Sequence, residues 1–199
     1  MNDNLEKIFN FLRQIEKLKS TLRYNKTTAG RNESTADHSW RLALMVPIIA
    51  KELSIDIDIE KSMKIALVHD LAEAITGDID AIKISTGEFL REEKKKQELS
   101  AMGKIRNMLP EKIGEDIYDL WQEYEEVSTN EGKFVRGLDK AETLTQLIEA
   151  GYTTYDKPDF IADYAEDAIK NFPEIKTILL VIREGLKIEF RKGGFNWEC

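Results

Sequence analysis

The chain has few of the residues that bind transition metals or form cross-links: one cysteine and two histidines among 199 residues. Cys199, at the C-terminus, has no cysteine partner within the chain, which excludes an intrachain disulfide framework and a cysteine-based zinc site. The opening residues have neither the basic start nor the long apolar run of a secretory signal, and no segment approaches the ~20 apolar residues of a membrane span. We therefore expect a cytoplasmic protein without a membrane partner.

Positively charged residues are also fewer than negatively charged ones: the chain has 29 Lys and Arg and 37 Asp and Glu, which gives a net charge of −8. A protein that binds a nucleic acid polymer through its phosphates needs a basic face, so this class of partner is disfavoured. A small anionic substrate would need a local source of positive charge, such as a metal ion.

Proline and glycine are too few, at 4 and 11, for a disordered or fibrous chain, and 42% of the residues are hydrophobic. A chain of this length can bury a sizeable core as one domain, so we expect a single domain over residues 1–199.

Apolar residues recur at spacings of three and four along most of the chain, which predicts an all-α fold. No run of strict alternation bounded by hairpin turn signals is evident. Further helices are expected at 38–53, 61–75, 88–109, 160–171 and 174–189, and irregular connections at 76–88 and 151–159. Pro47 should kink its helix or shift its boundary. The stripes expected to face the core are Leu5, Ile8, Phe9, Leu12, Ile15 and Leu18; Ile113, Ile117, Leu120, Trp121 and Tyr124; and Phe134, Leu138, Ala141, Thr145 and Ile148. Trp40 and Trp121 are interpreted as core residues.

One of the two histidines, His69, lies in the stretch "LVHDLAEAITGD" at 67–78, and it falls within the helix predicted at 61–75. His69 and Asp70 are expected in the middle of this largely buried helix, and both side chains can reach one ion placed between them. Glu73 follows His69 by four residues and so shares its helix face. Asp78 follows Gly77, where the helix is expected to end and the chain to bend back.

The first histidine, His38, opens another predicted helix, and Asp139 lies in the apolar stretch "FVRGLDKAETLTQLI". An unpaired carboxylate there would be costly. Read singly, His38 is a capping or packing residue, and Asp139 a core carboxylate paired with Lys140 or Arg136. Read together, two imidazoles and two carboxylates make a plausible site for one divalent metal ion, and Co, Mn, Mg, Fe, Ni or Zn would each suit such ligands to some degree.

The order His38, His69–Asp70, Asp139 in a helical chain resembles the H…HD…D signature of the HD-domain metal-dependent phosphohydrolases. The closer likeness is to their 5′-deoxynucleotidase branch, and it runs from about residue 5 to residue 150. The segments that carry it are "LKSTLRYN", "ESTADHSWRLALM", "ALVHDLAEAITGDI", "EEKKKQE", "LPEKIGEDIYDLWQEYEE" and "KFVRGLDKAETLTQ". The resemblance implies a metal-site core at about 20–150, with C-terminal helices at about 159–191 packed on it, and a homodimer.

The resemblance also implies a role for each residue of the motifs. His38, His69, Asp70 and Asp139 would hold the metal ion, which polarises a phosphoryl group and activates water. Two acidic residues would be catalytic: Glu73 would orient or deprotonate that water, and Asp78 would bond the sugar hydroxyl or assist proton transfer.

Arg23 would clamp the phosphate of the substrate. Some bacterial members have a tryptophan directly after this arginine, thought to crowd the 2′ position of the sugar, whereas this chain has Tyr24. The implied activity is hydrolysis of deoxyribonucleoside 5′-monophosphates to deoxynucleoside and phosphate. Two alternatives stay open: action on ribonucleotides or other small phosphomonoesters, and a non-catalytic, metal-stabilised nucleotide-binding module.

Overall fold

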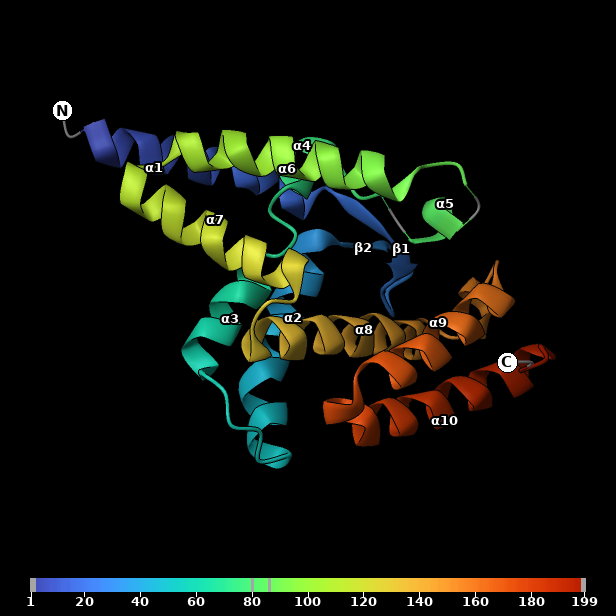
Figure 1. Ribbon diagram of the computed structural model, residues 1–199. Helices are drawn as coiled ribbons and strands as arrows, with labels where there is room; N and C mark the ends of the chain where they lie inside the picture. The colour runs from blue at the N-terminus through green and yellow to red at the C-terminus, as the bar shows by residue number, and fades with distance from the viewer. Residues whose placement is uncertain (1–2, 80, 86, 198–199) are drawn as a thin grey trace.

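The computed structural model describes residues 3–79, 81–85 and 87–197, and these are mainly helical (Figure 1). The α-helices are α1 (Asp3–Ile15), α2 (Thr35–Glu52), α3 (Ile59–Val68), α4 (Glu73–Thr76), α5 (Ala81–Ser85), α6 (Arg91–Met108), α7 (Glu111–Glu126), α8 (Asn130–Ala150), α9 (Pro158–Asn171) and α10 (Lys176–Gly193). Three short 3₁₀ segments, η1 (Glu16–Lys19), η2 (Tyr152–Thr154) and η3 (Pro173–Ile175), join them. The expected all-α class is confirmed, and no helix of the described residues is long and apolar enough to cross a membrane.

The helices gather around two hydrophobic clusters. In Figure 1, α1, α6 and α7 lie in the upper half, α9 and α10 at the lower right, and α2 and α3 at the lower left, with α8 running across from α2 to α9. The larger cluster joins α2, α3 and α8 to α9 and α10, with Leu42, Leu138 and Leu186 among its fully buried members. The smaller cluster joins α1, α6 and α7, with Phe11 and Met102 in it. The chain therefore has a seam between two packed groups of helices.

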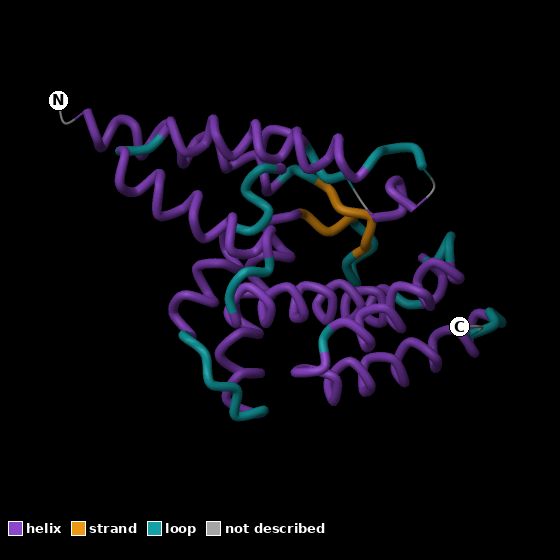
Figure 2. Tube along the Cα trace, in the orientation of Figure 1, coloured by secondary structure: helices purple, strands orange, loops and turns teal. Residues whose placement is uncertain are grey.

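The small sheet was not expected from the sequence. Strands β1 (Leu22–Lys26) and β2 (Asn32–Ser34) pair antiparallel, with Leu22 opposite Ser34, and appear orange in Figure 2. Gly30 in the connecting turn has φ +81°, a backbone angle that glycine adopts at little cost. The two strands, of five and three residues, are too short and too irregular in register to produce an alternating pattern.

The prediction of a single helix at 61–75 is wrong, because α3 ends at Val68 and α4 begins only at Glu73. Between them, i→i+3 backbone hydrogen bonds tighten the turn, as from Glu73 N–H to the Asp70 carbonyl at 3.1 Å. Ile65 belongs to the larger hydrophobic cluster and Leu71 to the smaller one. The His69–Asp70 pair therefore lies in a turn at the seam, not in the middle of a helix.

Other expectations from the periodicity have mixed outcomes. Trp121 is buried as expected, but Trp40 is 66% exposed on the outer side of α2, so its assignment to the core is wrong. Four residues of the stripes expected to face the core are exposed as well: Leu5, Phe9, Leu12 and Ile113. Helix α2 runs through Pro47 without a boundary there. The connection 76–88 contains the short α5.

A capping box fixes the start of α2. Ser34 accepts a hydrogen bond from the Asp37 N–H at 3.1 Å, and the Asp37 carboxylate accepts from the Ser34 N–H at 2.9 Å. The two bonds satisfy backbone donors that have no partner within the helix. The first turn of α2 holds Thr35 and His38 side by side in the interior.

Replacing the capping serine should loosen this turn. We expect Ser34→Ala to lower the free energy of unfolding by about 1 kcal/mol, because the partly buried Asp37 N–H loses its acceptor. Urea denaturation monitored by circular dichroism measures the change. Ser100→Ala, at an exposed position inside α6, is the matched control and should not lower the free energy of unfolding, because alanine favours a helix more than serine does. Equal stabilities of the two variants would contradict the capping role.

Candidate metal centre

Four side chains from three parts of the fold meet at the seam. His38 comes from the first turns of α2, His69 and Asp70 from the turn after α3, and Asp139 from the middle of α8. The two histidines and Asp139 are buried, and each offers a ligand atom within 4.8 Å of the others. The structure thus brings together the four residues that the sequence predicts as metal ligands.

The ligand atoms themselves are close. His38 Nε2 lies 3.3 Å from His69 Nε2 and 3.2 Å from Asp139 Oδ1. Asp70 Oδ2 lies 3.0 Å from His69 Nε2 and 4.0 Å from His38 Nε2. Two imidazole nitrogens and two carboxylate oxygens therefore surround one point.

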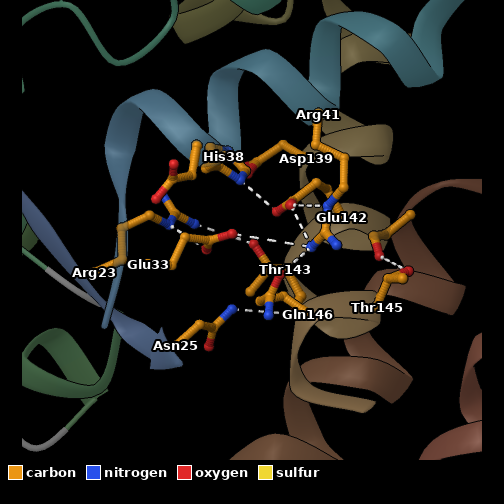
Figure 3. Close-up of polar contacts among 12 residues, drawn as sticks. Arg23, Asn25, Glu33, His38, Arg41, Asp139, Glu142, Thr143, Thr145 and Gln146 are labelled. Carbon is orange, nitrogen blue, oxygen red and sulfur yellow. Dashed lines mark hydrogen bonds and ion pairs between the residues drawn. The ribbon is translucent and has the colours of Figure 1, made fainter. Parts of the chain in front are cut away.

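Hydrogen bonds on the far sides of the imidazole rings decide which nitrogen carries the proton. Glu142, a residue buried in α8, accepts from His38 Nδ1, and Arg41 in turn donates to Glu142 from Nε at 2.6 Å (Figure 3). His69 Nδ1 donates to the Ala66 carbonyl at 2.9 Å. Both acceptors lack a proton to give, so both Nδ1 atoms are donors and both Nε2 lone pairs point at the shared centre.

Asp139 is oriented in the same way. Tyr124 donates to Asp139 Oδ2 at 2.8 Å and Lys140 Nζ lies 3.5 Å from the same oxygen, which leaves Oδ1 directed at His38. Of the two partners foreseen for Asp139, Lys140 is present, while Arg136 lies over the ring of Tyr124 and pairs with Glu125.

A cation fits this arrangement on the chemistry of its donors. In neutral imidazoles the two Nε2 lone pairs, 3.3 Å apart, would face one another and two carboxylates, an unfavourable arrangement that positive charge at the centre relieves. Burial and Arg23 lower the pKa of His38, but Glu142 and Asp139 outweigh them and raise this pKa to about 10. The surroundings therefore favour positive charge at this point, which a divalent ion would supply.

A second group of possible ligands, Glu33, His38 and Glu142, lies on the Nδ1 side of the same ring. Here the positive charge comes from the protein, because Arg41 Nη2 lies 2.6 Å from a Glu142 oxygen and 3.9 Å from Glu33. Arg41 also donates to Gln146 and Glu149 at 2.6 Å each. A second ion is not needed to balance these carboxylates.

Arg23 reaches the centre from β1. It donates from Nη1 to Asp70 Oδ2 at 3.3 Å and from Nη2 to Thr143 Oγ1 at 3.2 Å, and its Nε lies 3.4 Å from Glu33 (Figure 3). Burial lowers the pKa of Arg23, but the charges of Asp70, Glu73, Asp139 and Asp78 raise it well above its ordinary value. The four acidic residues predicted for the site therefore all stabilise the positive charge of Arg23.

Strand β1 is held against α8 by side chains. Asn25 Nδ2 donates to the Thr143 carbonyl at 3.1 Å, and Gln146 Nε2 donates to the Lys26 carbonyl at 2.7 Å. These bonds keep the hairpin, and with it Arg23, next to the helix that carries Asp139.

Glu73 begins α4 and is buried. Thr35 donates to Glu73 Oε2 at 2.6 Å, which ties the carboxyl group to the first turn of α2. Burial, together with the charges of Asp70 and Asp78, raises the pKa of Glu73 well above its usual value. A carboxyl group whose pKa is raised is a stronger proton acceptor than an ordinary carboxylate and is suited to proton transfer.

Tyr24 and Asp78 lie beside the centre rather than in it. Gly77 caps α4 with φ +72°, and Asp78 follows it, as the sequence predicts. Both Tyr24 and Asp78 line a pocket that also includes Arg23. The hydroxyl of Tyr24 donates to Asp156.

Sequence reasoning missed the residues that orient the candidate ligands, Glu142, Arg41 and Tyr124, and the one that orients Glu73, Thr35. A signal for Glu142 was available, because it follows Asp139 by three residues and so lies on the same side of an apolar helix. The other three have no local signal, since their roles come from contacts between separate helices.

Comparisons with known proteins agree with this geometry. The HD domain family model matches residues 15–176. The curated 5′-deoxynucleotidase HDDC2 of Homo sapiens is 33% identical over 176 residues, which cover 87% of this chain and 82% of that protein. The curated 5′-deoxynucleotidase hdd1 of Schizosaccharomyces pombe is 37% identical over 145 residues, or 70% of each chain.

The fold has a close counterpart among solved structures. A predicted metal-dependent phosphohydrolase from Magnetospirillum magnetotacticum superposes with a TM-score of 0.78 over 96% of this chain and 98% of that one, at 24% identity. The family match covers most of the chain and includes all four candidate ligands. The chain therefore belongs to the HD-domain family, and its curated relatives there are 5′-deoxynucleotidases.

Proposed function

We propose that this protein is a metal-dependent 5′-deoxynucleotidase, which hydrolyses deoxyribonucleoside 5′-monophosphates to deoxynucleoside and inorganic phosphate. The observation that carries the proposal is the meeting of two imidazole nitrogens and two carboxylate oxygens at 3.0–4.0 Å, beside Glu73 and Arg23. The curated relatives with this name support the choice of reaction.

His38, His69, Asp70 and Asp139 would hold one divalent ion. An ion of this kind supplies Lewis acidity to the phosphoryl group and lowers the pKa of its bound water. Nitrogen and oxygen ligands in equal number suit Co, Mn, Fe, Ni, Zn or Mg, and the distances in the protein do not favour one of them.

Glu73 and Asp78 would carry out the proton transfers of the reaction. Glu73 accepts the proton of the attacking water as the new phosphorus–oxygen bond forms. The bond from phosphorus to the 5′-oxygen breaks, and a proton returns to that oxygen from Glu73 or Asp78. Because the described part of the chain places no serine or cysteine nucleophile at the centre, direct attack by water is favoured over a phospho-enzyme.

Arg23 and the pocket beside it would bind the nucleotide. The guanidinium is suited to two oxygens of a phosphate, and Asp78 is suited to a sugar hydroxyl. Tyr24, fixed by its bond to Asp156, would stand against the 2′ position and favour deoxyribose.

We also propose that the protein works in the cytoplasm as a homodimer. Helix α2 buries one side in the core, yet its outer side carries Trp40, Leu44 and Ile48, all of them exposed and spaced by four residues. A helix that is apolar on both sides is usually covered on both. A second copy of the chain is the partner that the family likeness suggests.

The first prediction from the proposed function concerns turnover. Phosphate release should depend on an added divalent metal and should favour deoxyribonucleoside over ribonucleoside monophosphates. Glu73→Gln should lower kcat by about 100-fold or more while the metal content stays the same, because the amide cannot accept a proton. A phosphate assay on metal-stripped protein with Co, Mn, Mg or Zn added back measures this.

Glu60→Gln, at a side chain that is 79% exposed on α3, is the control and should match the unsubstituted protein. Release at the same rate from ribonucleotides would shift the proposal to a general nucleotidase. Tight metal binding with no release from any phosphomonoester would support a non-catalytic nucleotide-binding module instead.

The second prediction concerns metal affinity. Glu142→Gln should weaken metal binding by about 10- to 100-fold, because an amide no longer fixes His38 with its Nε2 lone pair toward the centre. Isothermal titration of the metal-stripped protein measures the affinity. Glu149→Gln is the matched control, since Glu149 also bonds Arg41, whereas the partner of His38 Nδ1 is Glu142. Equal losses in both variants would show that Arg41, and not the orientation of His38, controls affinity.

The third prediction concerns assembly. Trp40→Glu should convert the homodimer to a monomer, because a charge in a buried interface is costly. Light scattering after size-exclusion chromatography gives the mass. Val181→Glu places the same charge at a 71% exposed apolar position on α10 and should leave the dimer intact. A dimer that survives Trp40→Glu would show that α2 is not the interface.

A further inference from the structure

A pocket of about 90 Å³ opens beside the metal centre, between β1, α8 and α9. Arg23, Asp78 and Thr143 line the end nearest the candidate ligands, since Arg23 bonds both Asp70 and Thr143. The pocket therefore continues from the place where a phosphate would bind.

The opposite wall comes from α9 and is aromatic. Phe160 and Tyr164 are four residues apart and so share one side of the helix, with ring centroids 5.9 Å apart. Lys140 Nζ lies 4.9 Å from the centroid of the Tyr164 ring and holds it next to α8. The buried side chains of Leu147 and Ile161 complete an apolar surface.

The polar groups of the pocket are largely occupied by protein partners. The Asn25 amide donates to the Thr143 carbonyl, and the Tyr24 hydroxyl donates to Asp156. The α9 wall therefore offers ring faces and aliphatic carbon rather than a fixed set of donors and acceptors. Such a surface suits a flat aromatic group, which it contacts through stacking and not through hydrogen bonds.

We infer that Phe160 and Tyr164 of α9 form the nucleobase subsite of this enzyme, which binds purines and pyrimidines alike by stacking. This inference rests on the proposed function and deepens it. A 5′-nucleotide joins its phosphate and its base through one sugar, and the pocket likewise joins the guanidinium of Arg23 to the aromatic rings of α9. Stacking tolerates every base, because every base presents a π-face.

The test compares substrates with and without a base. Phe160→Leu keeps apolar volume and helix propensity but removes a ring. The ratio of kcat/KM for deoxyadenosine 5′-monophosphate to that for 2-deoxyribose 5-phosphate should fall about tenfold, and the change should be similar for thymidine 5′-monophosphate. Tyr164→Leu should lower the same ratio. Phe9→Leu, the same substitution at a 58% exposed position on α1, should leave it unchanged.

A second readout does not need turnover. Calorimetric binding of deoxyadenosine, which has a base but no phosphate, should weaken in Phe160→Leu, whereas binding of inorganic phosphate should not weaken to the same extent. An unchanged substrate ratio together with unchanged deoxyadenosine binding would overturn the inference. If the unsubstituted protein released no phosphate from any nucleotide, the proposed function would fail, and the base subsite would be judged on deoxyadenosine binding alone.

Discussion

The rest of the structure depends on the burial of acidic groups at the seam between two hydrophobic clusters. Glu33, Asp139 and Glu142 are all buried there, and burial of unpaired charge is strongly unfavourable. Their compensation comes from the same elements that form the centre: Arg23 from β1, and Arg41 together with His38 from α2. The hairpin, α2 and α8 are thus held in one arrangement by the charges that they bring to it.

The position of the seam also explains why the His69–Asp70 pair stands in a turn. Before the turn, α3 packs into the larger cluster as far as Ala66. After it, the chain packs into the smaller cluster from Leu71, so the turn is fixed at both ends by rigid packing. If His69 and Asp70 are metal ligands, their position between two cores means that they need no further ordering when an ion binds. Pre-organisation of this kind is a general requirement of metal sites.

Much of this could be predicted from the sequence, and the exceptions have physical reasons. His38, His69, Asp70 and Asp139 each have an ordinary structural explanation when read singly, but both histidines of the chain and two carboxylates in apolar surroundings were recognisable as a set. The short hairpin left no alternating pattern, and the exposure of Trp40 could not be read from a helix that is apolar on both sides. Periodicity identifies an apolar face but not what covers it.

Asp70 contacts both Arg23 and the imidazole of His69, and so connects the guanidinium to the candidate metal ligands. Asp70 Oδ2 lies 3.3 Å from Arg23 Nη1 and 3.0 Å from His69 Nε2, so one oxygen serves both the guanidinium and the metal centre. Under the proposed function, a cation at the centre would take over part of the neutralisation of Asp70, and more of the charge of Arg23 would then be available for a phosphate. Binding of the ion and binding of the phosphate would in that case strengthen one another, each by the same factor. An acidic protein could in this way hold an anionic substrate without a basic surface.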